Sequence, residues 1–246
     1  MTLAGKGDLA ARSQLTRLCA VKGTHWVTST RVLAWDGCAN VRDLGHLATA
    51  DGQRTRYAVL VRADDLGRLT KRGRDQVARH GIRTVINLRL PAEPAGLEDE
   101  RIRYQRLSLL EPNSDATKRI LESIEPEESY EMIIDACGPR FVAVFEAVRV
   151  ALRNGGVAFH CHAGRDRTGL VAAFILELAG VPDESIAADY AMSDCSHLGV
   201  EPALPETMQH VLDLVRERFG GVEQYLRRHG ATDELLTTLR TRLREE

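Results

Sequence analysis

The chain has 246 residues, of which 43% are hydrophobic and 28% are charged, the balance of an ordinary globular protein. Its formal net charge of −2 excludes a global basic field that would recruit nucleic acid or an anionic membrane, so any anion site has to be local. The five cysteines are far apart and form no Cys-x-x-Cys pair, which favours a reducing compartment, the cytoplasm, over a disulfide framework or a zinc site. We expect no transmembrane helix and no signal peptide, because no apolar stretch is long enough, and secretion without a signal peptide stays open.

The first half of the chain predicts two strands and a long insertion. Residues 1–28 are polar and weakly patterned, so we expect an N-terminal extension there and a catalytic domain over 29–246. Short β-branched, apolar runs at 57–62 and 82–88 predict strands. Between them Thr70 is the expected N-cap of a helix that ends at Gly81. Residues 91–138 carry prolines and many acidic groups with little apolar periodicity, which predicts a long connection or a lid.

The second half alternates helices with one further strand. Apolar residues at helical spacing predict an amphipathic helix over 139–153, followed by a strand at 157–160. Residues 170–179 are apolar nearly all round, which predicts a buried helix. Four more helices are expected, at 183–192, 205–219, 222–229 and 232–243. This order predicts a single α/β domain with a central, mostly parallel sheet flanked by helices.

One ten-residue motif, HCHAGRDRTG at 160–169, lies between the strand at 157–160 and the buried helix. The N-terminus of a helix carries unpaired N–H groups and a partial positive charge, and a curled loop before it gathers amides around one oxyanion. Gly164 supplies the freedom for that curl. Arg167 offers a planar fork to two phosphate oxygens. The loop residues expected to bind phosphate are His160, His162, Ala163, Gly164 and Arg165.

Cys161 is the predicted nucleophile of this loop. A thiol at a helix N-terminus close to an arginine is stabilised as a thiolate, which can attack phosphorus in line. Thr168 could donate a hydrogen bond to the sulfur and help it leave, and His160 is expected to orient the loop. No further Cys or His cluster supports a metal at His160 and His162, so we expect neither a metal nor another cofactor.

The reaction also needs a proton donor for the leaving group and a base for the attacking water. Asp166, inside the loop, is the first candidate for both roles. Alternatively, Asp166 is a solvated carboxylate and the acid comes from the insertion, where Glu111 and Asp135 are the candidates. Arg42 and Arg89 fit substrate-side cations or structural ion pairs equally well, and the five tyrosines are expected to serve packing.

The Cys-x5-Arg-Thr motif resembles the signature of protein tyrosine and dual-specificity phosphatases. The wider pattern is similar to the bacterial tyrosine phosphatase branch that contains a secreted mycobacterial enzyme with tyrosine and phosphoinositide activity. The supporting segments are residues 40–45 (NVRDLG), 62–64 (RAD), 85–89 (VINLR) with Glu93, and 189–190 (DY). The resemblance implies a helical lid at 91–138 and Asp166 as an in-loop acid. The chain departs from the family pattern at Asn87, His46 and Arg165.

These observations predict a phosphatase that hydrolyses phosphate monoesters through a phosphocysteine, with phosphotyrosine protein as its substrate and possible dual specificity. Arg165 and His162 add positive charge beside the loop, which keeps phosphoinositides open as an alternative. A phosphate-binding module without catalysis and a rhodanese-like sulfurtransferase are the remaining alternatives. The presence of all four predicted catalytic residues, Cys161, Asp166, Arg167 and Thr168, argues against a binding module without catalysis. The Arg-Thr-Gly that ends the motif argues against a sulfurtransferase.

Overall fold

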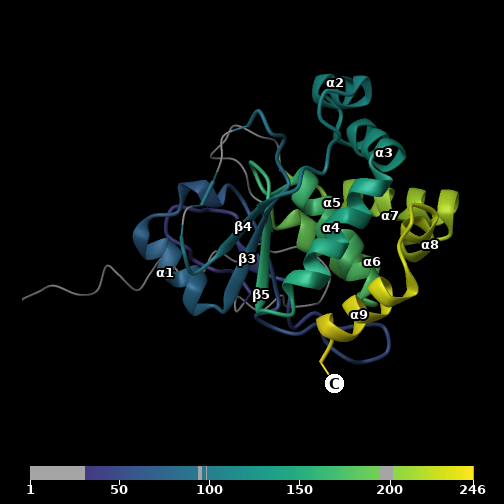
Figure 1. The fold of residues 1–246 in the computed structure, drawn as a ribbon. Helices are drawn as coiled ribbons and strands as arrows, with labels where there is room; N and C mark the ends of the chain where they lie inside the picture. Colours follow the sequence, from purple (N-terminus) through teal and green to yellow (C-terminus); the bar gives the residue numbers. More distant parts are fainter. Residues whose placement is uncertain (1–30, 94–95, 98, 194–201, 246) are drawn as a thin grey trace, which may run out of the picture.

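The computed structural model describes residues 31–93, 96–97, 99–193 and 202–245. The predicted extension at 1–28, Cys19 and Cys195 lie outside these residues. In the described part of the chain, one central sheet has helices on both faces, with α1 on one side and the larger helical layer on the other (Figure 1). Within the same ranges, no helix is long and apolar enough to cross a membrane.

The sheet has the strand order β1-β2-β5-β3-β4. Its strands are β1 (Arg42–Asp43), β2 (Leu60–Ala63), β3 (Ile82–Asn87), β4 (Arg103–Arg106) and β5 (Gly156–His160). Strands β2, β5, β3 and β4 run parallel, whereas β1 pairs antiparallel with β2. Every residue of the central strand β5 is buried. The expected mostly parallel sheet is therefore confirmed.

Alternating side chains of β5 supply two hydrophobic cores. Val157 and Phe159 belong to the larger cluster, which the main helical layer covers. Ala158 belongs to the smaller cluster, together with Val77 of α1 (Lys71–Arg79). Successive side chains of a strand point to opposite faces, so a strand that is apolar throughout needs cover on both. The apolar run at 157–159 thus specifies a buried central strand.

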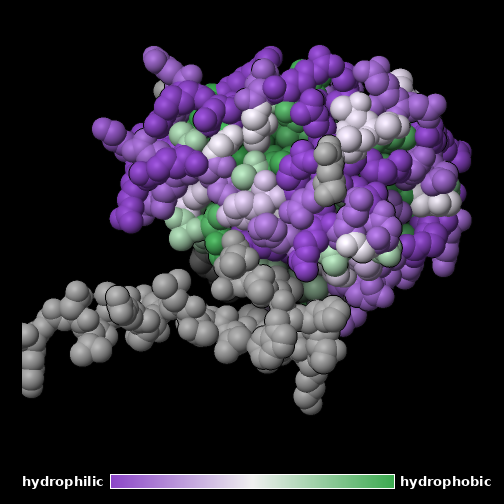
Figure 2. All heavy atoms as spheres, turned by 90° about the horizontal axis from the view of Figure 1, so that it is seen from below, coloured by the Kyte–Doolittle hydropathy of each residue, from purple (hydrophilic) through white to green (hydrophobic). Residues whose placement is uncertain are grey.

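The predicted helices are confirmed with small shifts of their ends. Thr70 caps α1 as expected, because its hydroxyl accepts a hydrogen bond from the Gly73 amide at 3.1 Å. The helices of the main layer are α4 (Gly138–Ala151), α5 (Asp166–Leu178), α6 (Asp183–Ala191), α7 (Pro205–Phe219), α8 (Val222–Arg228) and α9 (Asp233–Leu243). Helix α5 begins at Asp166 rather than at Leu170, because the end of the motif already forms its first turn. On the face shown in Figure 2, most described side chains are hydrophilic, as the outer faces of amphipathic helices are.

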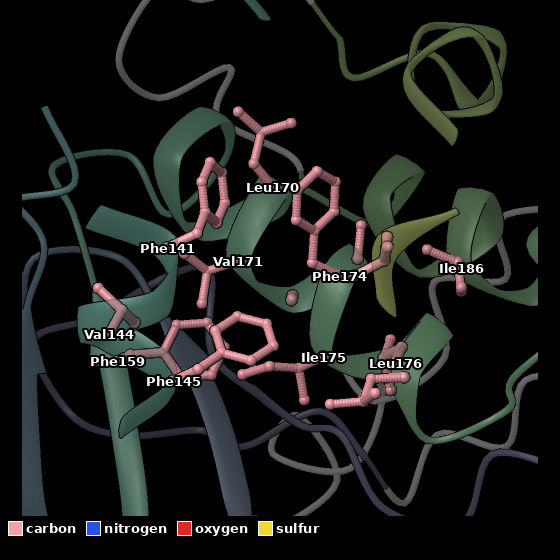
Figure 3. Packing of buried hydrophobic residues seen from close by; sticks show 14 of the residues in the cluster. Phe141, Val144, Phe145, Phe159, Leu170, Val171, Phe174, Ile175, Leu176 and Ile186 are labelled. Atoms are coloured by element: carbon pink, nitrogen blue, oxygen red, sulfur yellow. The ribbon is translucent and has the colours of Figure 1, made fainter. Parts of the chain in front are cut away.

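Aromatic packing fixes α5 against α4 and the sheet. Phe141 and Phe145 of α4, Phe159 of β5 and Phe174 of α5 lie together in the larger core (Figure 3). The rings of Phe141 and Phe174 stack with their centroids 4.7 Å apart. Burial of one such side chain contributes about 1.5–3 kcal/mol. This packing holds the N-terminus of α5 at one position relative to the end of β5.

The predicted insertion contains the expected helices and one strand that was not expected. Helices α2 (Asp115–Glu122) and α3 (Pro126–Ala136) lie above the main helical layer, at the upper right of Figure 1. The prediction was wrong for residues 103–106, which form the edge strand β4 beside β3. Its sequence, RYQR, has no apolar run, because an edge strand half open to solvent is held by backbone pairing with its neighbour. A short 3-10 helix, Leu66–Arg68, follows β2.

Candidate active site

Residues 161–165 connect β5 to α5 at the edge of the sheet where the parallel strands end. Open α/β sheets bind their ligands at this edge. Gly164 has a φ of 71°, in the left-handed region, and a Cβ at this position would lie 2.6 Å from the carbonyl oxygen of Ala63. Both facts exclude a side chain there. The predicted need for glycine at 164 thus follows from the curl of the loop and from its close approach to β2.

Side chains from the β1–β2 region hold two successive loop carbonyls from outside. The Asn40 side-chain amide donates to the Ala163 carbonyl at 2.9 Å, and the Arg62 guanidinium donates to the Gly164 carbonyl at 2.9 Å. In a trans peptide the N–H points away from the C=O of the same unit. The N–H groups that follow these carbonyls, at 164 and 165, therefore face the opposite side, where an anion would be cradled.

A buried ion cluster lies behind the loop. The carboxylate of Asp189 contacts three guanidiniums, those of Arg42 at 3.1 Å, Arg62 at 2.7 Å and Arg31. All four residues are at most 2% exposed. Burial alone would raise the pKa of Asp189, but the three arginines outweigh it and hold that pKa below its usual range. Arg42 is therefore a structural ion-pair residue, and Arg62 links the cluster directly to the loop.

Arg167 is oriented by a carboxylate in the connection that follows β3. Its Nη1 and Nη2 donate to the two oxygens of Glu93 at 2.7 and 3.2 Å. Glu93 also accepts from Arg89 Nε at 3.2 Å and from the Leu90 amide at 2.6 Å. Burial would raise the pKa of Glu93, but the hydrogen bond and charge of Arg167 lower it, so Glu93 is ionised. Each Nη atom carries a second N–H, and Nε a further one, so the fork keeps donors for a phosphate.

Asp166 opens α5 and is held by neighbours on both sides. Its Oδ1 accepts from the Tyr130 hydroxyl at 2.5 Å and from Arg165 Nε at 3.0 Å. The hydroxyls of Tyr130 and Tyr190 are 2.7 Å apart. The expectation that these two tyrosines serve only packing was therefore wrong. Apolar spacing cannot reveal a hydroxyl bonded to a carboxylate from another part of the chain.

The two carboxylates suggested in the insertion have partners away from the loop. Glu111 accepts from Arg140 Nε at 2.7 Å. Asp135 accepts from Arg218 at 3.3 Å. Both pairs lie at the surface. Of the three carboxylates considered from the sequence, Asp166 is the one that lies directly after the loop, on the first turn of α5.

The remaining predicted residues line the loop with different exposure. Cys161 is 2% exposed and His160 is fully buried, whereas His162 is exposed. His160 Nδ1 lies 3.0 Å from the Cys161 carbonyl oxygen, and burial lowers the pKa of this histidine to about 4, so it is neutral. Thr168 is fully buried, and its hydroxyl has no hydrogen-bond partner among the described residues. The predicted bond from Thr168 to the sulfur thus stays a prediction.

The departures from the family pattern have defined surroundings. Asn87 bonds the Tyr104 hydroxyl and accepts from the Arg89 amide at 2.9 Å. His46 has a φ of 62°, a conformation that favours glycine, which the family has there. Arg89 contacts Asp65 Oδ2 at 2.8 Å and is thus, like Arg42, part of structural ion pairs.

Three residues of the site carried little or no signal of their own in the sequence. Asn40, Arg62 and Glu93 were singled out there only through the resemblance. Their contacts with the loop join segments that are far apart along the chain, so spacing could not have assigned their roles.

Comparisons with known proteins show which family the chain resembles. A family model described as tyrosine phosphatase family matches residues 33–245. A tyrosine-protein phosphatase of Nostoc commune is 32% identical over 216 residues, covering 74% of this chain and 73% of that protein. The triple specificity protein phosphatase PtpB of Mycobacterium tuberculosis is 29% identical over 216 residues, covering 74% of each chain. The crystal structure of P. aeruginosa TpbA aligns at 17% identity with a TM-score of 0.43, covering 72% of this chain and 89% of that one.

The fold and the loop define a cysteine-dependent phosphatase, and the family match extends over nearly all of the described residues. The chain belongs to the tyrosine phosphatase family. The resemblance inferred from the motifs is thereby confirmed, and the two alternatives of another class, the binding module without catalysis and the sulfurtransferase, are set aside.

Proposed function

We propose that the loop at 161–165 and the start of α5 hydrolyse phosphotyrosine with Cys161 as the nucleophile. The observation that carries this proposal is the anchoring of the loop. Its carbonyls at Ala163 and Gly164 are bound from outside, so the N–H groups at 164 and 165 turn to the opposite side, and Arg167 follows on the first turn of α5. The thirteen residues of α5 add the positive end of a helix dipole at the same point. A thiolate and a dianion are both stabilised there.

In the first step, the Cys161 sulfur attacks phosphorus while the bond from phosphorus to the tyrosine oxygen breaks. Asp166 gives its proton to the departing oxygen, so phenol rather than phenolate leaves. The Arg167 fork binds two equatorial oxygens of the transferring phosphoryl group, with Glu93 fixing its plane. The product is a phosphocysteine and an ionised Asp166.

In the second step, water attacks the phosphocysteine and the sulfur–phosphorus bond breaks. Asp166 takes the proton of the attacking water, which restores the acid for the next turnover. The sulfur leaves as a thiolate, stabilised by the helix N-terminus and by a hydrogen bond from Thr168. Inorganic phosphate then leaves the loop.

The test is the variant Cys161→Ser. We expect hydrolysis of a phosphotyrosine peptide to fall by at least about 10³-fold, because the nucleophile is lost, while phosphate still binds to the intact loop in calorimetry. Cys38→Ser is the matched control, since Cys38 is a free thiol bonded to the Asp65 carbonyl at 3.6 Å. It should keep wild-type activity. Activity near wild type in Cys161→Ser would refute the proposed nucleophile.

Two observations bear on the substrate. Cys161 is only 2% exposed, which favours the long phosphotyrosine side chain over shorter phosphorylated residues. The exposed His162 of the loop supports phosphoinositide headgroups as a second candidate, and the mycobacterial relative is named as a triple specificity phosphatase. Phosphate release from a phosphotyrosine peptide and from phosphoinositide vesicles, measured with one enzyme preparation, separates the two.

The cytoplasm is the compartment that we propose. Cys38, Cys137 and Cys161 are free thiols in the described structure, and reducing conditions keep thiols in this state. Cell fractionation with an antibody against the chain tests this.

A further inference from the structure

Two buried tyrosines connect the insertion to the catalytic loop. Tyr130 lies on α3, and Tyr190 lies near the end of α6. Their side chains are 1% and 2% exposed, their rings meet edge to face at 86°, and their hydroxyls are 2.7 Å apart. The Tyr130 hydroxyl is also 2.5 Å from Asp166 Oδ1. Helices α3, α6 and α5 thus meet in one hydrogen-bonded chain that ends on a carboxylate of the loop.

The direction of this chain follows from the number of protons. A phenol has one proton to donate. Because Tyr130 donates to Asp166, its oxygen must accept from Tyr190. Burial, and next the Asp166 carboxylate, raise the pKa of Tyr130 well above its usual value, and burial raises the pKa of Tyr190 to about 12. Both phenols therefore keep their protons throughout the neutral range.

The Tyr190 ring packs against Gly169, the last residue of the signature motif. A Cβ at Gly169 would lie 2.9 Å from Cδ2 of the Tyr190 ring. Glycine at 169 thus lets the ring lie against the first turns of α5. The preceding residue, Asp189, is fixed by the buried arginine cluster. Tyr190 is therefore held rigidly, whereas Tyr130 is carried by an element of the insertion.

Asp166 needs such support because its side chain is 39% exposed. A half-exposed carboxylate on a helix end can rotate toward solvent. The hydrogen bonds from Tyr130 and Arg165 both go to Oδ1, and Oδ2 has no side-chain hydrogen bond to another described residue. With Oδ1 fixed, Oδ2 is the oxygen left to carry the proton that the proposed mechanism transfers.

We propose that Tyr130 is a positioning residue for Asp166, so that docking of α3 brings the proton donor into its working orientation. Tyr190 acts indirectly, because its hydroxyl donates to the Tyr130 hydroxyl and holds it in place. This inference rests on the proposed function, in which Asp166 protonates the leaving group. It gives the insertion a task in catalysis, because the acid is aligned only while α3 is in place.

The test uses Tyr130→Phe and two substrates that differ in their need for a proton. Phenyl phosphate releases a weakly acidic phenol, whereas p-nitrophenyl phosphate releases a far more acidic one. General acid catalysis is worth about 10²–10⁴-fold, and loss of one positioning bond removes part of it, so we expect kcat/KM for phenyl phosphate to fall about tenfold. For p-nitrophenyl phosphate the fall should stay below about twofold, because its leaving group depends little on the acid.

Tyr225→Phe is the matched control. The Tyr225 hydroxyl is also buried and also bonds α3, donating to the Ile134 carbonyl at 2.8 Å, but it does not touch Asp166. A merely structural effect of losing a buried phenol that packs at α3 would appear in both variants. We expect the ratio of the two kcat/KM values to change in Tyr130→Phe alone. Tyr190→Phe should change the ratio in the same direction by a smaller factor, which keeps the idea testable if Tyr130→Phe does not fold.

The variant Asp166→Asn separates this inference from the mechanism beneath it. On that background, Tyr130→Phe should have no further effect on the substrate ratio, because the group that it positions is gone. If Asp166→Asn lowers kcat/KM more for phenyl phosphate than for p-nitrophenyl phosphate, but Tyr130→Phe lowers both equally, the positioning role of Tyr130 is refuted. Asp166 then remains the proposed acid. If Asp166→Asn itself lowers both equally, Asp166 is not the acid and the inference fails with it.

Discussion

The buried cluster behind the loop allows a quantitative test of what holds the site. In Asp189→Asn the shape is nearly kept, but the carboxylate that faces Arg31, Arg42 and Arg62 is lost. Removing one partner of a buried ion pair costs about 3–5 kcal/mol, because the remaining charge stays buried without compensation. With a urea m-value of about 3 kcal/mol/M, the unfolding midpoint should fall by about 1–1.7 M. Equilibrium urea unfolding at pH 7 measures this.

The pH dependence of that difference has a defined sign. The pKa of Asp189 is lowered in the folded protein, so the carboxylate stabilises the fold above the ordinary pKa of an unfolded aspartate, about 3.9, and this stabilisation is lost as the pH falls below it. The gap between wild type and Asp189→Asn should be equal at pH 5 and pH 7. Asp213→Asn, in a half-exposed pair with Arg216, is the control and should cost less than about 1 kcal/mol. Equal midpoint shifts for the two variants would refute the reasoning.

Two further variants test the loop itself. Glu93→Gln replaces a carboxylate that accepts from both Nη atoms of Arg167 with an amide whose single oxygen accepts from one, so kcat/KM for phosphotyrosine peptide should fall about tenfold. The fall should be equal at all pH values from 5 to 8, because Glu93 stays ionised there. An unchanged kcat/KM would show that Glu93 does not orient the Arg167 guanidinium. Gly164→Ala should destabilise the protein by about 1–3 kcal/mol and remove most activity, since it adds strain and a clash at 2.6 Å. Gly52→Ala is the control, because Gly52 has a similar positive φ but no atom within 4 Å of the added Cβ. This variant should lose less stability in thermal unfolding and should keep full activity. Equal losses of stability in both glycine variants would argue against the close contact at 164.

Local signals in the sequence predicted most of the fold. The helix expected at 205–219 is α7 with the same ends, and Thr70 marked the start of α1, because helices are set by contacts within a few residues. The apolar run at 157–159 likewise marked the central strand. Strands β1 and β4 were not predicted. Their sequences are short and polar, and only pairing with β2 and β3 makes them strands.

The residues of the site also separate into those that local sequence predicted and those that only the tertiary structure revealed. Cys161, Asp166 and Arg167 lie within seven consecutive residues at a strand–helix junction, so the sequence by itself was enough to predict the loop and to name the nucleophile that we propose. Only the tertiary structure decided what holds these groups, because Glu93, Tyr130 and the cluster around Asp189 reach the loop from distant segments. Backbone propensity and side-chain spacing act over a few residues, whereas the orientation of a carboxylate or a guanidinium depends on whichever partners the folded chain brings within 3 Å.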